Sequence, residues 1–167
     1  MIKKSKILDS QAIEQKIRRL SWQIYEDNLD EREIVIVGIA GRGEILATYL
    51  SKIIADISTI RIKIGTIHID KENPYDNQIK IDLDVSEYTN KVVILADDVL
   101  NSGKTLMYAC KYFLTTPMIS LSTVVLVERM HNRFPIKADY VGLSLATTLQ
   151  EYITVSLNGD TKGVYLS

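Results

Sequence analysis

One stretch of the chain, residues 92–105, constrains the fold more than any other. It opens with an apolar, β-branched run at 92–96, which is typical of a buried strand, and this run ends in two adjacent carboxylates, Asp97 and Asp98. A short loop at 101–105 then leads into a segment with helical spacing. This order places acidic side chains and backbone N–H donors at one edge of a sheet, where they suit the hydroxyl and phosphate groups of a sugar phosphate.

Segments with helical spacing and segments with strand character alternate along the rest of the chain. Helical spacing is present at 10–28, where Asp9 or Ser10 can cap the first turn, and again after residue 43. Short apolar runs predict strands at 34–37, 121–127 and 139–142. Strands that alternate with helices favour an α/β fold with a mostly parallel sheet covered on both faces.

Other segments have the two-residue period of half-buried strands and predict antiparallel additions to that sheet. Residues 61–70 alternate with one phase slip at Gly65, which predicts a bulged strand, and residues 79–85 alternate strictly. Residues 151–157 and 162–166 flank an Asn-Gly-Asp turn and predict a hairpin.

The composition favours a single cytoplasmic domain over residues 1–167. Apolar residues make up 46% and charged residues 25%, ordinary values for a soluble globular protein, and no apolar run approaches the roughly 20 residues of a membrane helix. The net charge of −1 creates no general attraction to nucleic acid. Cys110 is the one cysteine, which excludes an internal disulfide, and His68 and His131 lack the spacing of a metal site.

The segment 92–105 resembles the 5-phosphoribosyl-1-pyrophosphate (PRPP) site of the type I phosphoribosyltransferases. That family has four apolar strand residues, two acids, two apolar residues, a variable residue and then Thr/Ser-Gly-x-Thr/Ser, and every position is matched here. The resemblance implies a mostly parallel sheet with helices on both faces and a small antiparallel hood. It also implies a PRPP site made of Asp97, Asp98, Val99, Leu100, Asn101, Ser102, Gly103, Lys104 and Thr105.

The same resemblance assigns roles within that site. Asp97 and Asp98 become the catalytic carboxylates, facing the ribose hydroxyls and lying near Mg²⁺, directly or through water.

Two other interpretations of the segment 92–105 compete with this one. A nucleotide-binding P-loop requires glycine where Asp98 stands, and a carboxylate there repels a triphosphate. A structural strand, turn and helix, with Ser102 as the cap, is the alternative without a ligand.

A second loop, at 38–43, also follows a strand and opens a helix. Its glycines permit tight turns, and Arg42 is a fixed cation that can bind phosphate with two hydrogen bonds. By resemblance to the family, this loop holds pyrophosphate through Ala40, Gly41, Arg42 and Gly43. The alternative is an ordinary strand-to-helix turn with an arginine that faces solvent.

A third segment, 127–142, narrows the resemblance to the pyrimidine operon attenuator and uracil phosphoribosyltransferase family. That pattern is an acid, Arg, Gly, His, a basic residue, then Leu/Phe-Pro-Ile-basic-Ala/Pro-Asp-Tyr/Phe-Val/Ile-Gly. The likeness implies that Tyr140 packs against the flat base, that the Val141 backbone reads its edge, and that Arg129 and Lys137 border the pocket. The alternative for Tyr140 is a half-buried strand aromatic.

The chain departs from this family at several positions. Met130 replaces a glycine near the expected base site, and the region 70–78 is shorter than the family's mobile catalytic hood, with Lys71 as its cation. The purine branch of the fold has Asp where Asn101 stands, placed to handle a purine ring proton. The first helix offers Arg18, Arg19 and Trp22 where the attenuator family binds RNA, although Trp22 fits an interface or the core equally well.

These features together predict transfer of a 5-phosphoribosyl group from PRPP to a nucleobase, with uracil favoured as the acceptor and UMP and pyrophosphate as products. Two alternatives stay open. One is a regulator of pyrimidine genes that senses PRPP or a nucleotide, binds RNA and has weak or no catalysis. The other is a purine phosphoribosyltransferase. A homodimer or higher homo-oligomer is expected by resemblance to the family.

Overall fold

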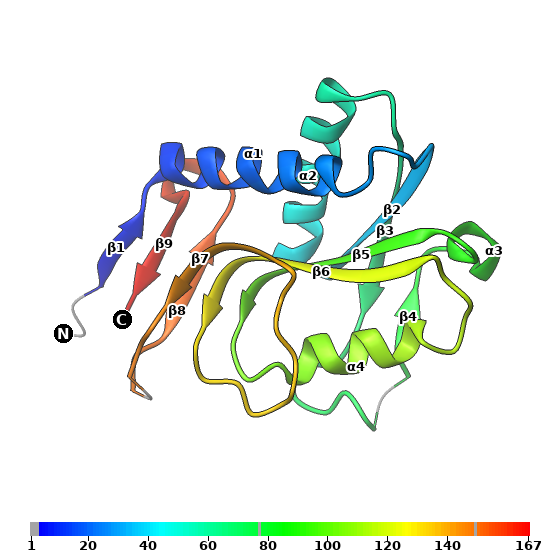
Figure 1. The fold of residues 1–167 in the computed structure, drawn as a ribbon. Coiled ribbons are helices and arrows are strands. Elements are labelled where there is room, and N and C mark those ends of the chain that lie inside the picture. The colour runs from blue at the N-terminus through cyan, green and yellow to red at the C-terminus, as the bar shows by residue number, and fades with distance from the viewer. Residues whose placement is uncertain (1–3, 77, 149) are drawn as a thin grey trace.

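The strands of the computed structural model, which describes residues 4–76, 78–148 and 150–167, form two sheets (Figure 1). The larger sheet has the strand order β4-β3-β2-β5-β6-β7. Its parallel strands are β2 (Glu33–Ile39), β3 (Arg61–His68), β5 (Val92–Leu100), β6 (Ser120–Arg129) and β7 (Tyr140–Leu145). The short edge strand β4 (Lys80–Ile81) is antiparallel to β3. The predicted mostly parallel α/β sheet is therefore confirmed.

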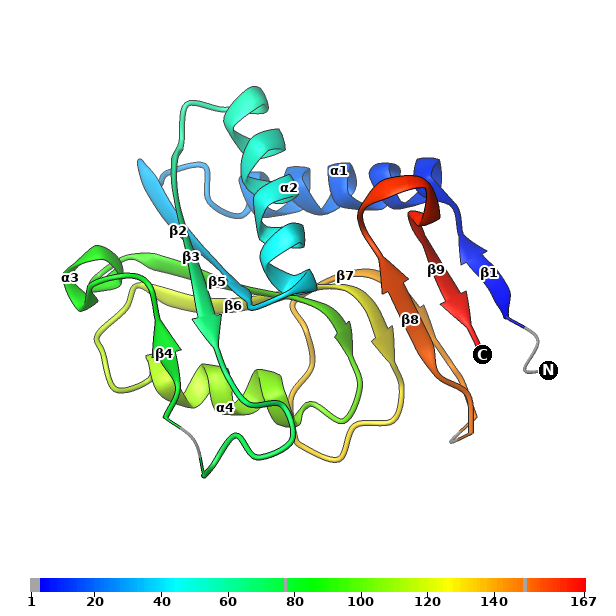
Figure 2. The same cartoon turned by 180° about the vertical axis from the view of Figure 1, so that it is seen from behind.

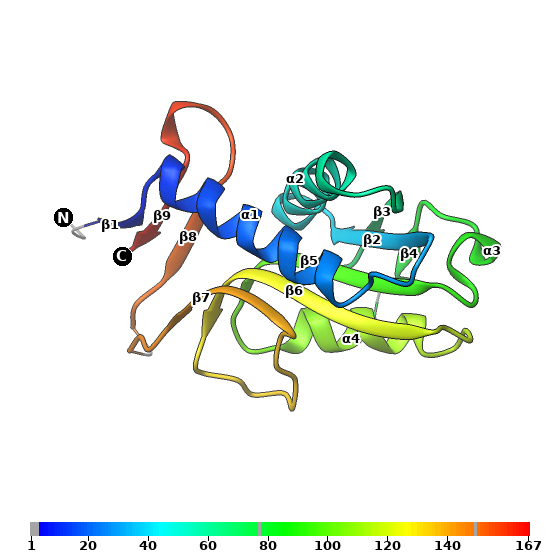
Figure 3. The same ribbon diagram turned by 45° about the horizontal axis from the view of Figure 1, so that its top comes forward.

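Helices cover both faces of this sheet, as predicted (Figures 2 and 3). On one face lie α1 (Ser10–Glu26) and α2 (Arg42–Ile57), and on the other lies α4 (Lys104–Phe113). Asp9 caps α1, because its side chain accepts a hydrogen bond from the Ala12 N–H at 2.8 Å. Each face has its own apolar core, since successive side chains of a buried strand point to opposite sides of the sheet.

The smaller sheet is antiparallel and has the order β1-β9-β8. It consists of β1 (Ser5–Leu8), β8 (Ile153–Ser156) and β9 (Gly163–Leu166), and a 3₁₀ turn, η1 (Gly159–Thr161), joins the last two strands. The predicted hairpin is confirmed, and β1 is an addition that its short, basic sequence did not indicate. Figure 1 shows this sheet beside the carboxyl ends of β6 and β7, and β8 also contacts β5.

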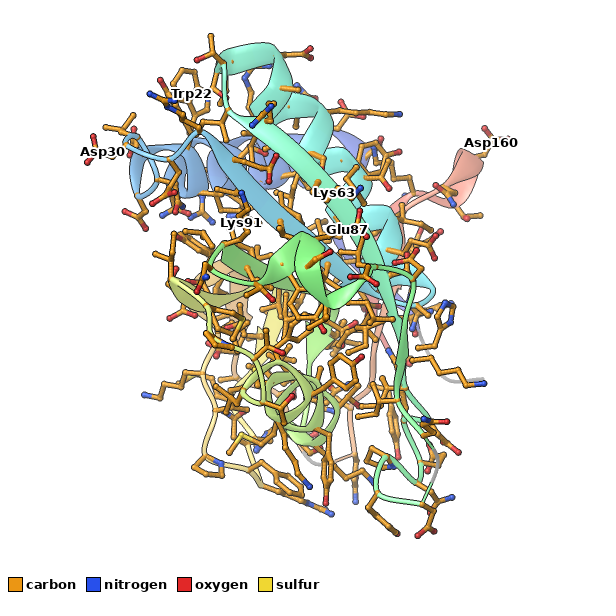
Figure 4. The ribbon with its side chains drawn as sticks, turned by 90° about the vertical axis from the view of Figure 1, so that its right-hand side faces the viewer. Trp22, Asp30, Lys63, Glu87, Lys91 and Asp160 are labelled. Atoms are coloured by element: carbon orange, nitrogen blue, oxygen red, sulfur yellow. The ribbon has the colours of Figure 1, made fainter. Side chains whose placement is uncertain are left out.

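Two predictions about the opposite edge were wrong. The β3 register with β2 runs without interruption from Arg61 to Ile67, so there is no bulge at Gly65. The strand expected at 79–85 is limited to β4, because Asp84 caps the short helix α3 (Val85–Tyr88) in a capping box with Glu87. An ion pair between Lys63 and Glu87 ties α3 to β3 (Figure 4).

Candidate functional site

A pocket of about 180 Å³ lies at the carboxyl ends of the central strands, where parallel α/β sheets bind their ligands. All nine residues predicted from the 92–105 motif line it, together with Arg42, Lys71 and three apolar side chains from other elements. The full lining is Arg42, Lys71, Asp97, Asp98, Val99, Leu100, Asn101, Ser102, Gly103, Lys104, Thr105, Leu106, Val125 and Ile153. The structure therefore brings the predicted motif to one cavity.

Each carboxylate at the end of β5 meets a cation from a different loop. Asp97 and Asp98 are only 4% and 2% exposed, and both line the pocket. Arg42, the first residue of α2, donates from Nε to Oδ2 of Asp98 at 2.5 Å. Lys71, which follows β3, places its Nζ 3.6 Å from Oδ1 of Asp97. The pocket thus holds two buried carboxyl groups, each beside a half-exposed cation.

Burial of the side chain, followed by the negative charge of the adjacent Asp98, raises the pKa of the Asp97 carboxyl to about 7, although Lys71 partly opposes the shift. In the unfolded chain the pKa of this carboxyl returns to about 3.9. Between these two values the folded protein binds a proton that the unfolded chain has already lost.

The stability of the ligand-free protein should consequently respond to pH through Asp97. Because the folded-state pKa is the raised one, this contribution is fully present below about pH 4. The contribution of Asp97 to the free energy of unfolding decreases as the pH rises toward about 7, and it does not change further above that pH. Urea unfolding at several pH values should show a weaker fall in stability with rising pH for Asp97→Asn than for the unchanged protein. Equal slopes in the two proteins would contradict the assignment.

The loop between β2 and α2 brings α2 very close to the end of β5. Gly41 has a φ of +96°, a conformation that glycine adopts without steric cost, and it precedes the first turn of α2. A Cβ on Gly43 would lie 2.6 Å from the Ala96 carbonyl oxygen. Of the four residues predicted to hold pyrophosphate, Arg42 lines the pocket and Gly43 abuts Asp97, whereas the Ala40 N–H is already bonded to the Ile67 carbonyl.

The loop at 101–105, here called the phosphate loop, is held in place by the segment at 133–136. Its Ser102 carbonyl accepts hydrogen bonds from the backbone N–H groups of Arg133 and Phe134, at 2.9 and 3.0 Å. Gly103, with a φ of +85°, starts α4 and packs against Ile136 so closely that a Cβ would lie 2.6 Å from its Cγ2. The first N–H groups of a helix have no backbone partner inside it, and the first residues of α4 line the pocket, so this helix end suits an anion. The Lys104 N–H donates to Ser102 Oγ at 3.3 Å.

The structure does not bring Tyr140 and Val141 to this pocket. Tyr140 is the first residue of β7 and pairs with Val124, which is level with Ala96 of β5, but neither Tyr140 nor Val141 lines the pocket. Its ring is 8% exposed and its hydroxyl donates to Asp27 at 2.8 Å. The Val141 carbonyl accepts from Arg19 at 3.0 Å. Tyr140 is thus a mostly buried strand aromatic, as in the alternative given above, and the contacts of Tyr140 and Val141 with a base stay predictions.

Of the other residues singled out in the 127–142 segment, Lys137 and Met130 lie outside the pocket and Arg129 lies beside it. Lys137 is exposed before β7 begins and does not line the pocket, so its predicted role is also not supported. Met130 is 68% exposed, which means that its bulk does not fill the cavity. Arg129, in contrast, lies beside the pocket. Its guanidinium donates to Thr147 Oγ1, Asn101 Oδ1 and the Thr148 carbonyl, at 3.0, 3.3 and 3.1 Å.

The residues considered for RNA are placed differently from one another. Arg19 is occupied, because it donates to the carbonyls of Val141 and Gly142 and to the Gln23 side chain. Trp22 is 40% exposed and its ring packs edge-on against Tyr25, and Figure 4 shows it on the outer surface of the molecule. Arg19 thus belongs to the packing of α1 on β7.

Four pocket residues were not among the predicted site residues: Lys71, Leu106, Val125 and Ile153. Ile153 reaches the pocket from β8, which is distant in the sequence and carries no motif. Lys71 was noted as a cation, but its pairing with Asp97 depends on how the segment after β3 folds back. That segment is tied to the phosphate loop, since Lys104 Nζ donates to the Glu72 carbonyl at 2.8 Å.

The sheet order, the helices on both faces and the small antiparallel sheet define an α/β protein with the type I phosphoribosyltransferase fold. A sequence profile of the phosphoribosyl transferase domain matches residues 3–156. The chain therefore belongs to the phosphoribosyl transferase family, and it is a phosphoribosyltransferase.

Relatives with known names agree with this assignment. The chain is 36% identical over 165 residues to the bifunctional protein PyrR of Clostridium acetobutylicum, covering 93% of this chain and 92% of that protein. It is 34% identical over 170 residues to the bifunctional protein PyrR of Oceanobacillus iheyensis, covering 95% and 93%. These matches extend over nearly the whole of each protein.

Solved structures resemble the fold at lower sequence identity. The hypoxanthine phosphoribosyltransferase of Trypanosoma cruzi superposes with a TM-score of 0.79 at 18% identity, covering 97% of this chain and 95% of that one. A hypoxanthine-guanine phosphoribosyltransferase of Bacillus anthracis gives 0.76 at 20% identity, covering 97% and 96%. Within the described residues, no helix is long and apolar enough to cross a membrane.

Proposed function

We propose that this phosphoribosyltransferase moves the 5-phosphoribosyl group of PRPP to uracil, giving UMP and pyrophosphate. The observation that carries the proposal is the pair of buried carboxylates, Asp97 and Asp98, between the phosphate loop and the cations of two further loops. The choice of uracil is supported by the resemblance of the 127–142 segment to the attenuator and uracil family and by the PyrR relatives.

Each part of PRPP has a matching part of the pocket in this proposal. The 5′-phosphate lies on the backbone N–H groups of the phosphate loop and of the first turn of α4. The ribose hydroxyls donate to Asp97 and Asp98, and the pyrophosphate lies near Arg42 and Lys71, which already line the same cavity. Because both cations are about half exposed, they can turn from the carboxylates to the pyrophosphate at little cost.

Mg²⁺ is the cofactor that we propose, and the donor set fits it. Mg²⁺ is commonly bound through one or two carboxylates with substrate phosphates and water completing its shell. Asp97 and Asp98 supply two carboxylates, and within the described residues there is no cluster of three metal-binding side chains. When bound, the ion would neutralise the negative charge that develops on the pyrophosphate.

The base has two aliphatic walls available. Val99, from the end of β5, and Ile153, from β8, are half-buried side chains that line the pocket, whereas Leu100, Leu106 and Val125 are buried in the core. Flat apolar surfaces of this kind suit a planar base on both sides. We propose that Val99 and Ile153 take the place that the sequence analysis gave to Tyr140.

Product analysis tests the proposal directly. The protein is mixed with PRPP, Mg²⁺ and one of uracil, hypoxanthine, guanine, xanthine or adenine, and products are separated by liquid chromatography. UMP is the expected product. A purine nucleotide instead would support the purine alternative. No product with any base, while PRPP still raises the melting temperature, would favour the RNA-binding regulator. RNA binding and self-association remain predictions from the sequence.

A further inference from the structure

The contact between Arg129 and Asn101 joins two elements of the pocket that are far apart in the sequence. Arg129 is the last residue of β6, and Asn101 follows β5 and lines the cavity. We propose that these residues form a specificity-determining pair, which favours a base with a carbonyl oxygen next to its attacking nitrogen. The inference rests on the proposed phosphoribosyl transfer and deepens it.

Arg129 is held in place by more than its contact with Asn101. Its Nε donates to Thr147 Oγ1 at 3.0 Å and its Nη2 to the Thr148 carbonyl at 3.1 Å. The Thr148 backbone is itself held, because its N–H donates to Glu151 Oε2 at 2.6 Å. A planar guanidinium with two such anchors has little freedom to rotate. The direction of the Nη1 donor toward Asn101 is therefore fixed.

This direction decides which way the Asn101 amide points. Arginine has only donors, so the atom of the amide that faces it at 3.3 Å must be the oxygen. The NH₂ group then lies at the other end of the planar amide, turned away from Arg129, and it makes no hydrogen bond to an acceptor among the described residues. Asn101 consequently offers a donor at the pocket and keeps its acceptor for Arg129.

A donor at this place suits uracil as the nucleophile. Uracil loses its N1 proton to water, the N1 lone pair forms the bond to ribose C1′, and the electrons of the C1′–O bond leave with pyrophosphate. Before the bond forms, the negative charge of the uracil anion is shared between N1 and the adjacent C2 oxygen. An amide N–H directed at that oxygen stabilises the anion, as preorganised donors stabilise other oxyanions.

A purine presents a hydrogen-bond donor, not an acceptor, to the NH₂ group of Asn101. A neutral purine that attacks through N9 carries a proton on the other ring nitrogen of its imidazole, and that proton must be accepted during the reaction. The NH₂ group of Asn101 cannot accept it, whereas a carboxylate can. Two donors that face each other are also mutually repulsive. The orientation set by Arg129 therefore acts against purines as well as for uracil.

The test is the ratio of kcat/KM for uracil to kcat/KM for hypoxanthine. We expect Asn101→Ala to lower kcat/KM for uracil about 10- to 100-fold, the effect of one hydrogen bond to a charged oxygen. Asn101→Asp should lower it at least as much and shift the ratio toward hypoxanthine. Arg129→Gln should reduce the ratio in the same direction, because the amide is then free to turn. Lys52→Gln, an exposed charge change on α2, should leave the ratio unchanged.

A double variant separates positioning from a general structural role. If Arg129 acts through Asn101, then Arg129→Gln changes the ratio no further once Asn101→Ala is present. A ratio that stays constant in all three single variants, or a preference for hypoxanthine in the unchanged protein, would overturn this inference alone. Absence of product from either base would overturn the proposed transfer, and this inference with it.

Discussion

Asp98→Asn is expected to lower kcat by about 10²–10³, the loss typical of removing one preorganised electrostatic group from an active site. The side chain is 2% exposed and lies near the end of the central strand β5, so its negative charge acts in a poorly solvated place. In the proposed reaction, departure of pyrophosphate leaves positive charge on the ribose ring, and we expect this carboxylate to stabilise that charge. The amide of asparagine has nearly the same shape and no charge, so the variant isolates the electrostatic contribution.

Steady-state kinetics with PRPP and the accepted base measure this effect. The melting temperature with and without PRPP, recorded on the same variant, shows whether the fold and the phosphate loop are intact. Asp56→Asn is a matched control, because it removes the charge of an exposed carboxylate on α2, outside the pocket. A value of kcat within twofold of the unchanged protein would remove Asp98 from the proposed mechanism.

Gly43→Ala is expected to destabilise the protein by about 3 kcal/mol, at the upper end of the cost of overpacking a core. The new Cβ would lie 2.6 Å from the Ala96 carbonyl oxygen and 3.2 Å from the Asp97 Cα, which belong to the backbone of the central strand and cannot turn away. The better helix propensity of alanine, roughly 1 kcal/mol, is smaller than this cost. The start of α2 must then move away from β5 and carry Arg42 with it.

Urea unfolding measures the loss of stability, and a reduced shift of the melting temperature by PRPP should accompany it. Glu44→Ala is the matched control, since it introduces the same side chain one residue later, where the position is exposed. Only a few tenths of a kcal/mol are expected there, from the favourable charge at the helix N-terminus. Equal stability of Gly43→Ala and the unchanged protein would show that α2 is not held against β5 as described.

The limits of sequence analysis are clearest at Tyr140 and Ile153. Tyr140 lies in a segment with a strong family pattern, but its position along β7 depends on pairing with Val124, which no local pattern specifies. Its hydroxyl then bonds to Asp27 at the end of α1. Ile153 has no motif at all and reaches the pocket because the small sheet packs beside β5. In both cases the side chain's place is set by contacts between distant segments.

The edge of the large sheet illustrates a second kind of limit, competition between local signals. Residues 79–85 alternate as a strand would, yet Asp84 and Glu87 form a capping box that begins a helix within that stretch. The phase slip at Gly65 suggested a bulge, whereas β3 pairs continuously with β2. The pairing of β3 with β2 extends along the whole of β2, and it outweighs a single irregular position in the pattern.

The sequence by itself determined the fold class and the wall of the pocket formed by residues 97–105. The strand, the two carboxylates, the loop and the helix of 92–105 are contiguous, so their relative positions follow from local backbone geometry and one buried strand. Only the tertiary structure decided which cations meet Asp97 and Asp98, that Ile153 lines the pocket and that Arg129 contacts Asn101. Those contacts join residues that are far apart in the chain, and they exist only where the packing of the two sheets and their helices places them.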